Sequence, residues 1–202
     1  MESESIQKVV LATRNRGKQA EFQSLLGGRF ELITLEDLDI PSPAEDGLTF
    51  IENAVLKARH ASRESGLPAI ADDSGLCVDA LDGAPGIYSA RYAGADATDN
   101  ENNERLLIDL EGVSESDRTA RFHCTLVSLR HADDPEPLIS QGVWQGKILF
   151  EPRGENGFGY DPLFWSYESE CASAELSMVE KRLVSHRGRA TAELIPLINK
   201  LV

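Results

Sequence analysis

The sequence predicts an α/β fold built around a mixed β-sheet with flanking helices. In the first part of the chain, a strand at Lys8–Ala12 is followed by a helix at about Gln19–Leu26 and a strand at Phe30–Leu35. Later, two longer alternating segments, Arg118–Arg130 and Leu138–Leu149, indicate a β-hairpin. Strands that alternate with helices favour parallel pairing, whereas a hairpin pairs antiparallel. The two patterns together therefore predict a sheet of mixed direction.

Three helices have clear start or stop signals. Thr49 and Glu52 have the spacing of a capping box, and Gly66 ends the helix that they begin. Its apolar face is predicted to consist of Ile51, Ala54, Ala58 and Ala61. Thr98–Glu101 repeats the capping-box pattern before a helix to about Leu110. A last helix is expected after His186, kinked or split at Pro196.

The segments between these elements predict ordered loops and one buried strand. The stretch Asp37–Gly47 carries two prolines and several acids. The apolar segment Leu67–Ala71 leads into "ADDSGLCVDAL", which we expect to be a buried strand interrupted by a turn. "LDGAPGIYSARYAG" is rich in Gly and Pro and predicts an ordered loop. No repeat or low-complexity linker separates these segments, so the 202 residues are expected to form one domain, 1–202, with two lobes.

Composition restricts the partners of the chain. The 34 acidic and 20 basic residues give a net charge of −14, which argues against a polymeric nucleic acid but allows a small anion where cations gather. The three Cys (Cys77, Cys124 and Cys171) form no C-x-x-C pair, which predicts free thiols in a reducing cytoplasm. The polar segment Met1 to Lys8 lacks the apolar core of a signal peptide, and no apolar run approaches the roughly 18 residues that span a bilayer.

The first candidate site is the segment "LATRNRGK" after the first strand. A strand, a loop and a helix N-terminus together present free backbone N–H groups, where an anion is favoured. The segment adds side-chain donors, cations and a glycine that allows close backbone approach: Thr13, Arg14, Asn15, Arg16, Gly17 and Lys18. It is not a Walker A loop, because no G-x-x-x-x-G-K-[ST] occurs. The alternative is a solvated loop with incidental cations.

The second candidate site is the carboxylate pair Asp72-Asp73. Two adjacent acids at the end of an apolar strand need a positive partner, and Mg²⁺ takes one or two carboxylates together with waters and phosphate oxygens. Adjacent strand residues point to opposite faces, so we expect only one Asp to contact a metal directly. Glu45, Asp46 and Glu52 supply further carboxylates, although acids near a helix start also stabilise its dipole. Asn53 adds an amide early in the same helix, with a solvated side chain as the alternative. The alternative for Asp-Ser-Gly is an Asx-type turn.

The third candidate site combines the segment Gly157–Asp161 with donors further along the chain. Phe158 and Tyr160 offer aromatic faces that could stack a nucleobase, and the alternative is a turn that feeds the apolar segment after it. Lys181, His186 and Arg187 place donors before the last helix. His186 could act as a general base, a donor to a base edge, or a helix cap.

Taken in order, the motifs resemble those of the inosine triphosphate pyrophosphatase family, and most closely its bacterial branch. The matching segments cover nearly the whole chain: "LATRNRGK", "EDGLTFIENAVLKA", "ADDSGL", "GAPGIYSARYAG", "FHCTLVSL", "GFGYDPLF" and "SHRGRA". The resemblance implies an elongated fold with a cleft between two lobes, a homodimer and a Mg²⁺ requirement. It also implies a hydrolase that converts ITP, dITP and XTP to the monophosphate and pyrophosphate, which cleanses the nucleotide pool.

The resemblance also assigns roles to residues. Asp73 matches the catalytic acid–base position and a metal ligand, and Glu45 matches a second metal-associated carboxylate. Ser74 would contact the substrate, and the segment Thr13–Lys18 would hold the triphosphate. The base and sugar would be held by Phe158, Gly159, Tyr160, Asp161, Lys181, His186 and Arg187. The chain departs from related sequences at Met178-Val179 and at Arg182, and Arg14 and Arg16 make its phosphate loop more cationic.

We expect donors from Lys181, His186 or Arg187 to pair with the 6-oxygen of hypoxanthine or xanthine and to disfavour the 6-amino group of adenine. Two other functions stay open at this point. One is a nucleotide-binding or sensing module without catalysis, and the other is a phosphohydrolase that acts on other nucleotides or on sugar phosphates. Release of pyrophosphate with a purine preference distinguishes the expected enzyme from both.

Overall fold

The computed structural model describes residues 7–198, so residues 1–6, on which part of the expectation about the N-terminus depends, lie outside it. The described chain forms two compact units. Unit 1 comprises residues 7–73, 125–140 and 191–198, and unit 2 comprises residues 74–124 and 141–190. The helices, named in chain order, are α1 (Arg16–Leu26), α2 (Phe50–Ser65), α3 (Asp99–Asp109), α4 (Met178–Val184) and α5 (His186–Ile198).

The strands form one seven-stranded sheet with the order β2-β1-β3-β4-β5-β6-β7. Their bounds are β1 (Gln7–Leu11), β2 (Phe30–Thr34), β3 (Ala69–Val78), β4 (Thr119–Leu129), β5 (Leu138–Ile148), β6 (Phe164–Ser166) and β7 (Cys171–Ala172). β1 pairs parallel with β2 and β3, whereas β6 pairs antiparallel with β5 and β7. The prediction of an α/β fold with a mixed sheet is confirmed.

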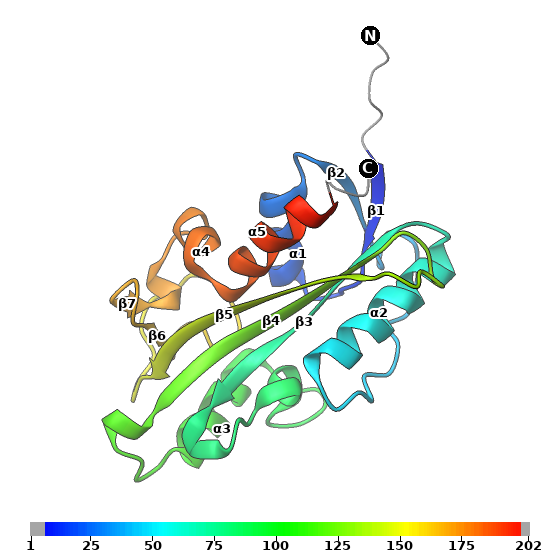
Figure 1. Ribbon diagram of the computed structural model, residues 1–202. Coiled ribbons are helices and arrows are strands. Elements are labelled where there is room, and N and C mark those ends of the chain that lie inside the picture. Colours follow the sequence, from blue (N-terminus) through cyan, green and yellow to red (C-terminus); the bar gives the residue numbers. More distant parts are fainter. Residues whose placement is uncertain (1–6, 199–202) are drawn as a thin grey trace. The chain divides into compact units, whose positions relative to one another are not determined.

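In unit 1, α1 and α2 lie on opposite faces of the sheet (Figure 1). The strand order explains this arrangement, because β1–α1–β2 and β2–α2–β3 are crossovers that step across the sheet in opposite directions. Right-handed crossovers in opposite directions place their helices on opposite faces. The face of α2 that is rich in alanine packs into one core cluster, which includes Val10, Ala54, Ala58, Ala61, Ala71 and Val127.

Unit 2 has its own core, which is rich in aromatic residues. The buried members include Leu76, Leu106, Phe122, Trp144, Tyr160 and Phe164. The segment between β3 and α3 contains two short 3₁₀-helices, Asp79–Leu81 and Gly86–Arg91, where an ordered loop was predicted. Two further 3₁₀-helices lie at Glu115–Asp117 and Ser173–Glu175.

The predicted helix signals at Thr49 and Thr98 are confirmed. Each threonine Oγ1 accepts a hydrogen bond from the backbone N–H three residues later, and at Thr98 the Glu101 carboxylate completes the capping box. Gly66 ends α2 in the left-handed conformation, with φ of 70°. Ala54, Ala58 and Ala61 are fully buried, but Ile51 is 40% exposed, so the predicted apolar face begins one turn later than expected.

Several details differ from the expectations. α1 begins at Arg16 because Asn15 caps it, so Arg16 to Lys18 form its first turn instead of a loop. β3 runs from Ala69 to Val78 without the predicted turn, because both carboxylates find cationic partners within the extended strand. The short helix α4 was not predicted. α5 continues through Pro196 as far as Ile198, so it is not split there.

No helix within residues 7–198 is long and apolar enough to cross a membrane. Cys77, Cys124 and Cys171 form no disulfide bond within residues 7–198, as predicted.

The loop that joins β4 to β5 is fixed by a buried carboxylate. The side chain of Asp134 accepts hydrogen bonds from the backbone N–H groups of Arg130 and Glu136 and from the Arg130 guanidinium. These bonds hold the pKa of Asp134 well below its ordinary value, and the bond from the Arg130 side chain has the largest effect. A depressed carboxyl pKa stabilises the fold above the pKa of the unfolded state, and this contribution is lost as the pH falls.

We expect Asp134→Asn to lower the free energy of unfolding by about 1–3 kcal/mol at neutral pH, because an amide is a weaker acceptor for these donors. The difference from the wild type should shrink below about pH 4, where the carboxyl of the unfolded chain is protonated. Urea unfolding at both pH values measures it. Asp133→Asn is the matched control, because the Asp133 side chain is 88% exposed and should change stability by less than about 0.5 kcal/mol. Equal losses in both variants at neutral pH would contradict this role of Asp134.

Candidate active site

Two lysines from two helices neutralise the adjacent carboxylates of β3. Asp72 forms an ion pair with Lys18 from α1, and Asp73 forms one with Lys57 from α2, at 2.6 Å between Nζ and Oδ1. Adjacent residues of an extended strand point to opposite faces, and α1 and α2 cover opposite faces. The two aspartates therefore have different partners, and the expectation that only one of them contacts a metal stays a prediction.

The Asp73 carboxylate lies at the centre of a buried cluster of polar groups. Its Oδ2 accepts a hydrogen bond from Asn53 Nδ2 at 3.4 Å, and Lys57 Nζ also contacts Glu45 Oε1 at 3.0 Å. Asp73 is 5% exposed and Lys57 is 8% exposed. Asp73, Glu45, Lys57 and Asn53 thus come together from a strand, a loop and one helix face.

The charges in this cluster have perturbed proton affinities. Burial raises the pKa of Asp73 above its ordinary value, and the nearby ammonium groups of Lys57 and Lys18 offset this only in part. Burial alone would lower the pKa of Lys57, but the carboxylates of Asp73, Glu45 and Asp72 outweigh it and raise that pKa. A carboxylate whose pKa lies above the usual range is better suited to accept a proton than an ordinary aspartate.

Lys57 was missed by the sequence analysis, although a signal was present, whereas Asn53 was noted as an amide early in the helix. They lie four residues apart on α2 and fall on the face that the alanine spacing marks as buried. A lysine on a buried helix face needs an anionic partner, because an unpaired buried charge is costly. The same reasoning that marked Asp72-Asp73 as needing a cation could have led to Lys57.

The cationic segment at the start of α1 is partly exposed. Arg14, Asn15 and Arg16 are exposed, whereas Thr13, Gly17 and Lys18 are half-buried. Asn15 Oδ1 accepts the Lys18 backbone N–H at 2.9 Å, and Thr13 Oγ1 accepts that of Asn15. The first turn of α1 contains Arg16 and Lys18 and no acidic residue, so like charges meet at the positive end of the helix dipole. An anion bound there would relieve this repulsion.

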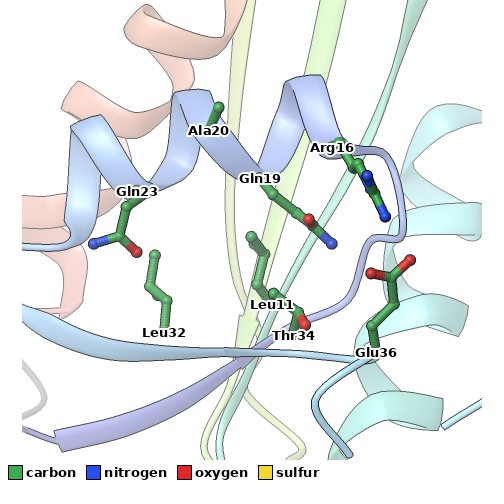
Figure 2. Close-up of a pocket in the computed structure, with 8 residues that line it drawn as sticks. All are labelled: Leu11, Arg16, Gln19, Ala20, Gln23, Leu32, Thr34 and Glu36. Carbon is green, nitrogen blue, oxygen red and sulfur yellow. The ribbon is translucent and has the colours of Figure 1, made fainter. Parts of the chain in front are cut away.

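Arg16 also lines a pocket of about 430 Å³ under α1, together with Leu11, Gln19, Ala20, Gln23, Leu32, Thr34 and Glu36. Figure 2 shows the Arg16 side chain at the same end of this pocket as Glu36. Lys18 instead extends to Asp72. The two cations of the first turn therefore have different surroundings, and the role of Arg16 toward a phosphate stays a prediction.

In unit 2, Asp161 organises the residues that were predicted to hold a base. Its carboxylate accepts hydrogen bonds from Lys181 Nζ at 2.6 Å, from Ser173 Oγ at 2.7 Å and from the Phe158 backbone N–H at 2.9 Å. The Phe158 ring faces two cations, with Lys181 Nζ 4.9 Å and Arg187 Cζ 5.9 Å from its centroid. Phe158 is half-buried and Lys181 is buried, so these groups are held in fixed positions.

The remaining predicted residues of unit 2 are packed into the interior. Arg187 is 1% exposed and donates from Nη2 to Ser74 Oγ at 2.8 Å. The His186 ring stacks on that of Phe122, with centroids 4.7 Å apart. The start of α5 also lies close to Gly142 of β5, where a Cβ would lie 2.0 Å from the His186 carbonyl oxygen. The Tyr160 ring belongs to the core, and its hydroxyl donates to the Ser89 carbonyl oxygen.

Comparisons with known proteins give the family. The Ham1 family model matches residues 9–197. A dITP/XTP pyrophosphatase of Photobacterium profundum is 59% identical over 188 residues, which cover 93% of this chain and 95% of that protein. A dITP/XTP pyrophosphatase of Vibrio cholerae is 54% identical, with coverage of 96% and 98%.

Solved structures agree with this assignment. A HAM1 protein from Coxiella burnetii has a TM-score of 0.87 at 47% identity, covering 96% of this chain and 99% of that one. A nucleoside-triphosphatase, also named dITP/XTP pyrophosphatase, from Mycobacterium abscessus has a TM-score of 0.74 at 40% identity, with coverage of 94% and 99%. The chain belongs to the Ham1 family. The family that the sequence motifs predict is thereby confirmed.

We predict that the ion pairs of Lys57 stabilise the fold. Lys57→Met removes the cation between two carboxylates, and we expect the free energy of unfolding to fall by about 3 kcal/mol, because Asp73 stays buried without its partner. The measurement is urea unfolding in EDTA, so that no metal ion substitutes for the ammonium group. Adding Asp73→Asn to Lys57→Met should restore part of the loss.

Arg63→Met on the same helix is the control for this prediction. The Arg63 side chain is 60% exposed, and its Nη2 lies 3.7 Å from the exposed carboxylate of Asp133. We expect a change of less than about 0.5 kcal/mol. If Lys57→Met is as stable as Arg63→Met, the buried ion pairs are not a significant constraint on the fold.

Proposed function

We propose that this protein hydrolyses the non-standard purine nucleoside triphosphates ITP, dITP and XTP to the monophosphate and pyrophosphate. The observation that carries the proposal is the buried Asp73 carboxylate, which Lys57 and Asn53 hold in position and whose pKa is raised by burial. The names of the relatives, at up to 59% identity over nearly the whole chain, support the same reaction.

In the proposed reaction, Asp73 positions the attacking water and accepts its proton. Attack at the α-phosphorus breaks the bond between the α-phosphorus and the oxygen that bridges to the β-phosphate. The pyrophosphate then leaves with that oxygen and the bonding electrons. Lys57 restrains the rotamer of Asp73 and stabilises its ionised form, because its ammonium group lies 2.6 Å from Oδ1.

The first turn of α1 is proposed to bind the phosphates. Its backbone N–H groups and the side chains of Thr13 to Lys18 offer donors and positive charge to an anion. Lys18 would stabilise the charge that develops on the departing pyrophosphate, while Asp72 holds its ammonium group on the side of the sheet that α1 covers. The two aspartates would therefore have different roles: Asp72 orients a cation, and Asp73 handles the proton.

The donor set fits a divalent cation. Asp73 and Glu45 both lie within 3.0 Å of one ammonium nitrogen, so their oxygens can approach a common positive charge. No group of three or more His, Cys, Asp or Glu that could hold a metal occurs in the part of the chain that the structure describes. Mg²⁺ suits such a site, because it takes one or two carboxylates and fills its other positions with waters and phosphate oxygens. When bound, the cation would neutralise phosphate charge and lower the pKa of a coordinated water.

Unit 2 is proposed to select the base. A purine would stack on Phe158, and Lys181, His186 and Arg187 are the candidate donors to its 6-oxygen. Ser74, Gly159, Tyr160 and Asp161 complete the proposed contacts with base and sugar. Adenine presents an amino group at position 6, so a buried donor would lose its acceptor at a cost of about 1–3 kcal/mol. This predicts a preference for inosine over adenosine nucleotides of about tenfold or more.

Other properties implied by the family likeness are also proposals. We propose that the chain functions as one domain, 1–202, and as a homodimer. We also propose that it works in the cytoplasm, which its three free thiols support. A net charge of −14 agrees with a small-molecule substrate in place of a polymeric nucleic acid.

The direct test is pyrophosphate release from ITP, XTP, dITP, ATP and GTP, each with Mg²⁺ and with EDTA. We expect rapid, metal-dependent release from the first three and at least tenfold slower release from ATP. Guanine also carries the 6-oxygen, so slow release from GTP, which the family likeness implies, requires rejection of its 2-amino group. Equal release from all five would retain the chemistry and contradict the proposed base selection. Binding of ITP without turnover would instead identify a sensor, and release of single phosphates would identify a different phosphohydrolase.

A further inference from the structure

Two side chains of helix α3 form hydrogen bonds to the backbone of Gly159, one to its N–H and one to its carbonyl oxygen. Asp99 Oδ2 accepts a hydrogen bond from the Gly159 N–H at 2.7 Å, and Asn103 Nδ2 donates to the Gly159 carbonyl oxygen at 2.9 Å. Asp99 and Asn103 are four residues apart, so their side chains project from the same face of α3. Gly159 has φ of +61°, a conformation that favours glycine, and the two bonds fix it there.

The environment of Asn103 suggests that this contact has a function beyond stability. Asn103 is 8% exposed, and its Oδ1 makes no hydrogen bond to any described residue. The orientation of the amide is determined, because the Gly159 carbonyl oxygen can only accept and must face Nδ2. The fold therefore tolerates one unsatisfied buried acceptor while Asn103 makes this single bond to Gly159.

Gly159 is the residue that follows Phe158. The Phe158 N–H is bonded to Asp161, and the Tyr160 hydroxyl to the Ser89 carbonyl oxygen, so the bonds to α3 complete the restraint on residues 158–161. Through this backbone they restrain the Phe158 ring, which faces Lys181 and Arg187. A shift of Gly159 would move the ring away from the two cations.

We propose that Asp99 and Asn103 are positioning residues for base recognition: they hold Gly159, and thereby the Phe158 ring, in the orientation on which a purine stacks. This inference rests on the proposed function, because it takes Phe158 as the stacking surface. Neither residue is proposed to contact the substrate. Their loss should weaken binding of the base while binding of the phosphates stays unchanged.

The test compares Asn103→Ala with Asn102→Ala. Asn102 is the adjacent residue of α3, is 2% exposed and bonds to the Ala93 N–H and the Ala90 carbonyl oxygen, so its loss has a similar structural cost without touching Gly159. Calorimetry would measure the binding of two probes: inosine monophosphate, which carries the base, and pyrophosphate, which does not. Thermal unfolding of both variants gives the structural cost.

We expect Asn103→Ala to weaken inosine monophosphate binding by about tenfold and to leave pyrophosphate binding within about twofold. In turnover, KM for ITP should rise by a similar factor, with kcat within about threefold. Asn102→Ala should lower the Tm comparably and change neither affinity. Asp99→Ala should act like Asn103→Ala, and Asp99→Asn should restore binding because it keeps an oxygen acceptor for the Gly159 N–H.

Three results would overturn the inference. One is an unchanged affinity of Asn103→Ala for inosine monophosphate, and another is an equal loss for both probes. A third is an equal loss in Asn102→Ala, which would make the effect a general consequence of lower stability. The binding assay does not depend on turnover, so a wild-type protein that binds inosine monophosphate but releases no pyrophosphate would contradict the proposed function alone.

Discussion

The buried pairing of two adjacent aspartates with two lysines is the constraint on which unit 1 depends. Asp72 and Asp73 point to opposite faces of β3, and each is neutralised by a lysine from the helix on its own face. Neither carboxylate could stay buried and ionised without its lysine. The two ion pairs therefore connect both crossover helices, α1 and α2, to the strand β3 that lies between them.

The same arrangement separates two chemical roles. On the α1 side, the Asp72–Lys18 pair lies at a helix N-terminus whose first turn carries positive charge and no acid. On the α2 side, Asp73 is buried with an amide and one ammonium group, and its pKa is raised. One face of the strand is thus suited to bind an anion, and the other to move a proton.

Much of the fold could be predicted from local patterns. The capping boxes at Thr49 and Thr98, the alanine face of α2 and the β4–β5 hairpin are short-range signals, and their elements form close to the predicted bounds. β3 was harder to predict, because Asp-Ser-Gly favours a turn and only the distant lysines make an extended strand favourable. The seven residues of α4 gave too short a pattern to distinguish from a loop.

For the candidate site, the sequence suggested residues but not the contacts between them. Asp73 and Glu45 were named, yet Lys57, which joins them, was not, since its role depends on a contact between separate elements. Asp161 was expected to contact the substrate, and the structure shows its carboxylate bonded to Lys181, Ser173 and the Phe158 backbone. The bonds from Asp99 and Asn103 to Gly159 join positions more than fifty residues apart, which no local pattern reveals.

The proposed mechanism requires Asp73 as the proton acceptor. The decisive measurement is single-turnover hydrolysis of ITP by Asp73→Asn, together with the affinity of the variant for ITP in the absence of turnover. We expect the rate of the chemical step to fall by about 100-fold or more while ITP is still bound. Hydrolysis at the wild-type rate would show that Asp73 does not accept the proton and would contradict the proposed mechanism.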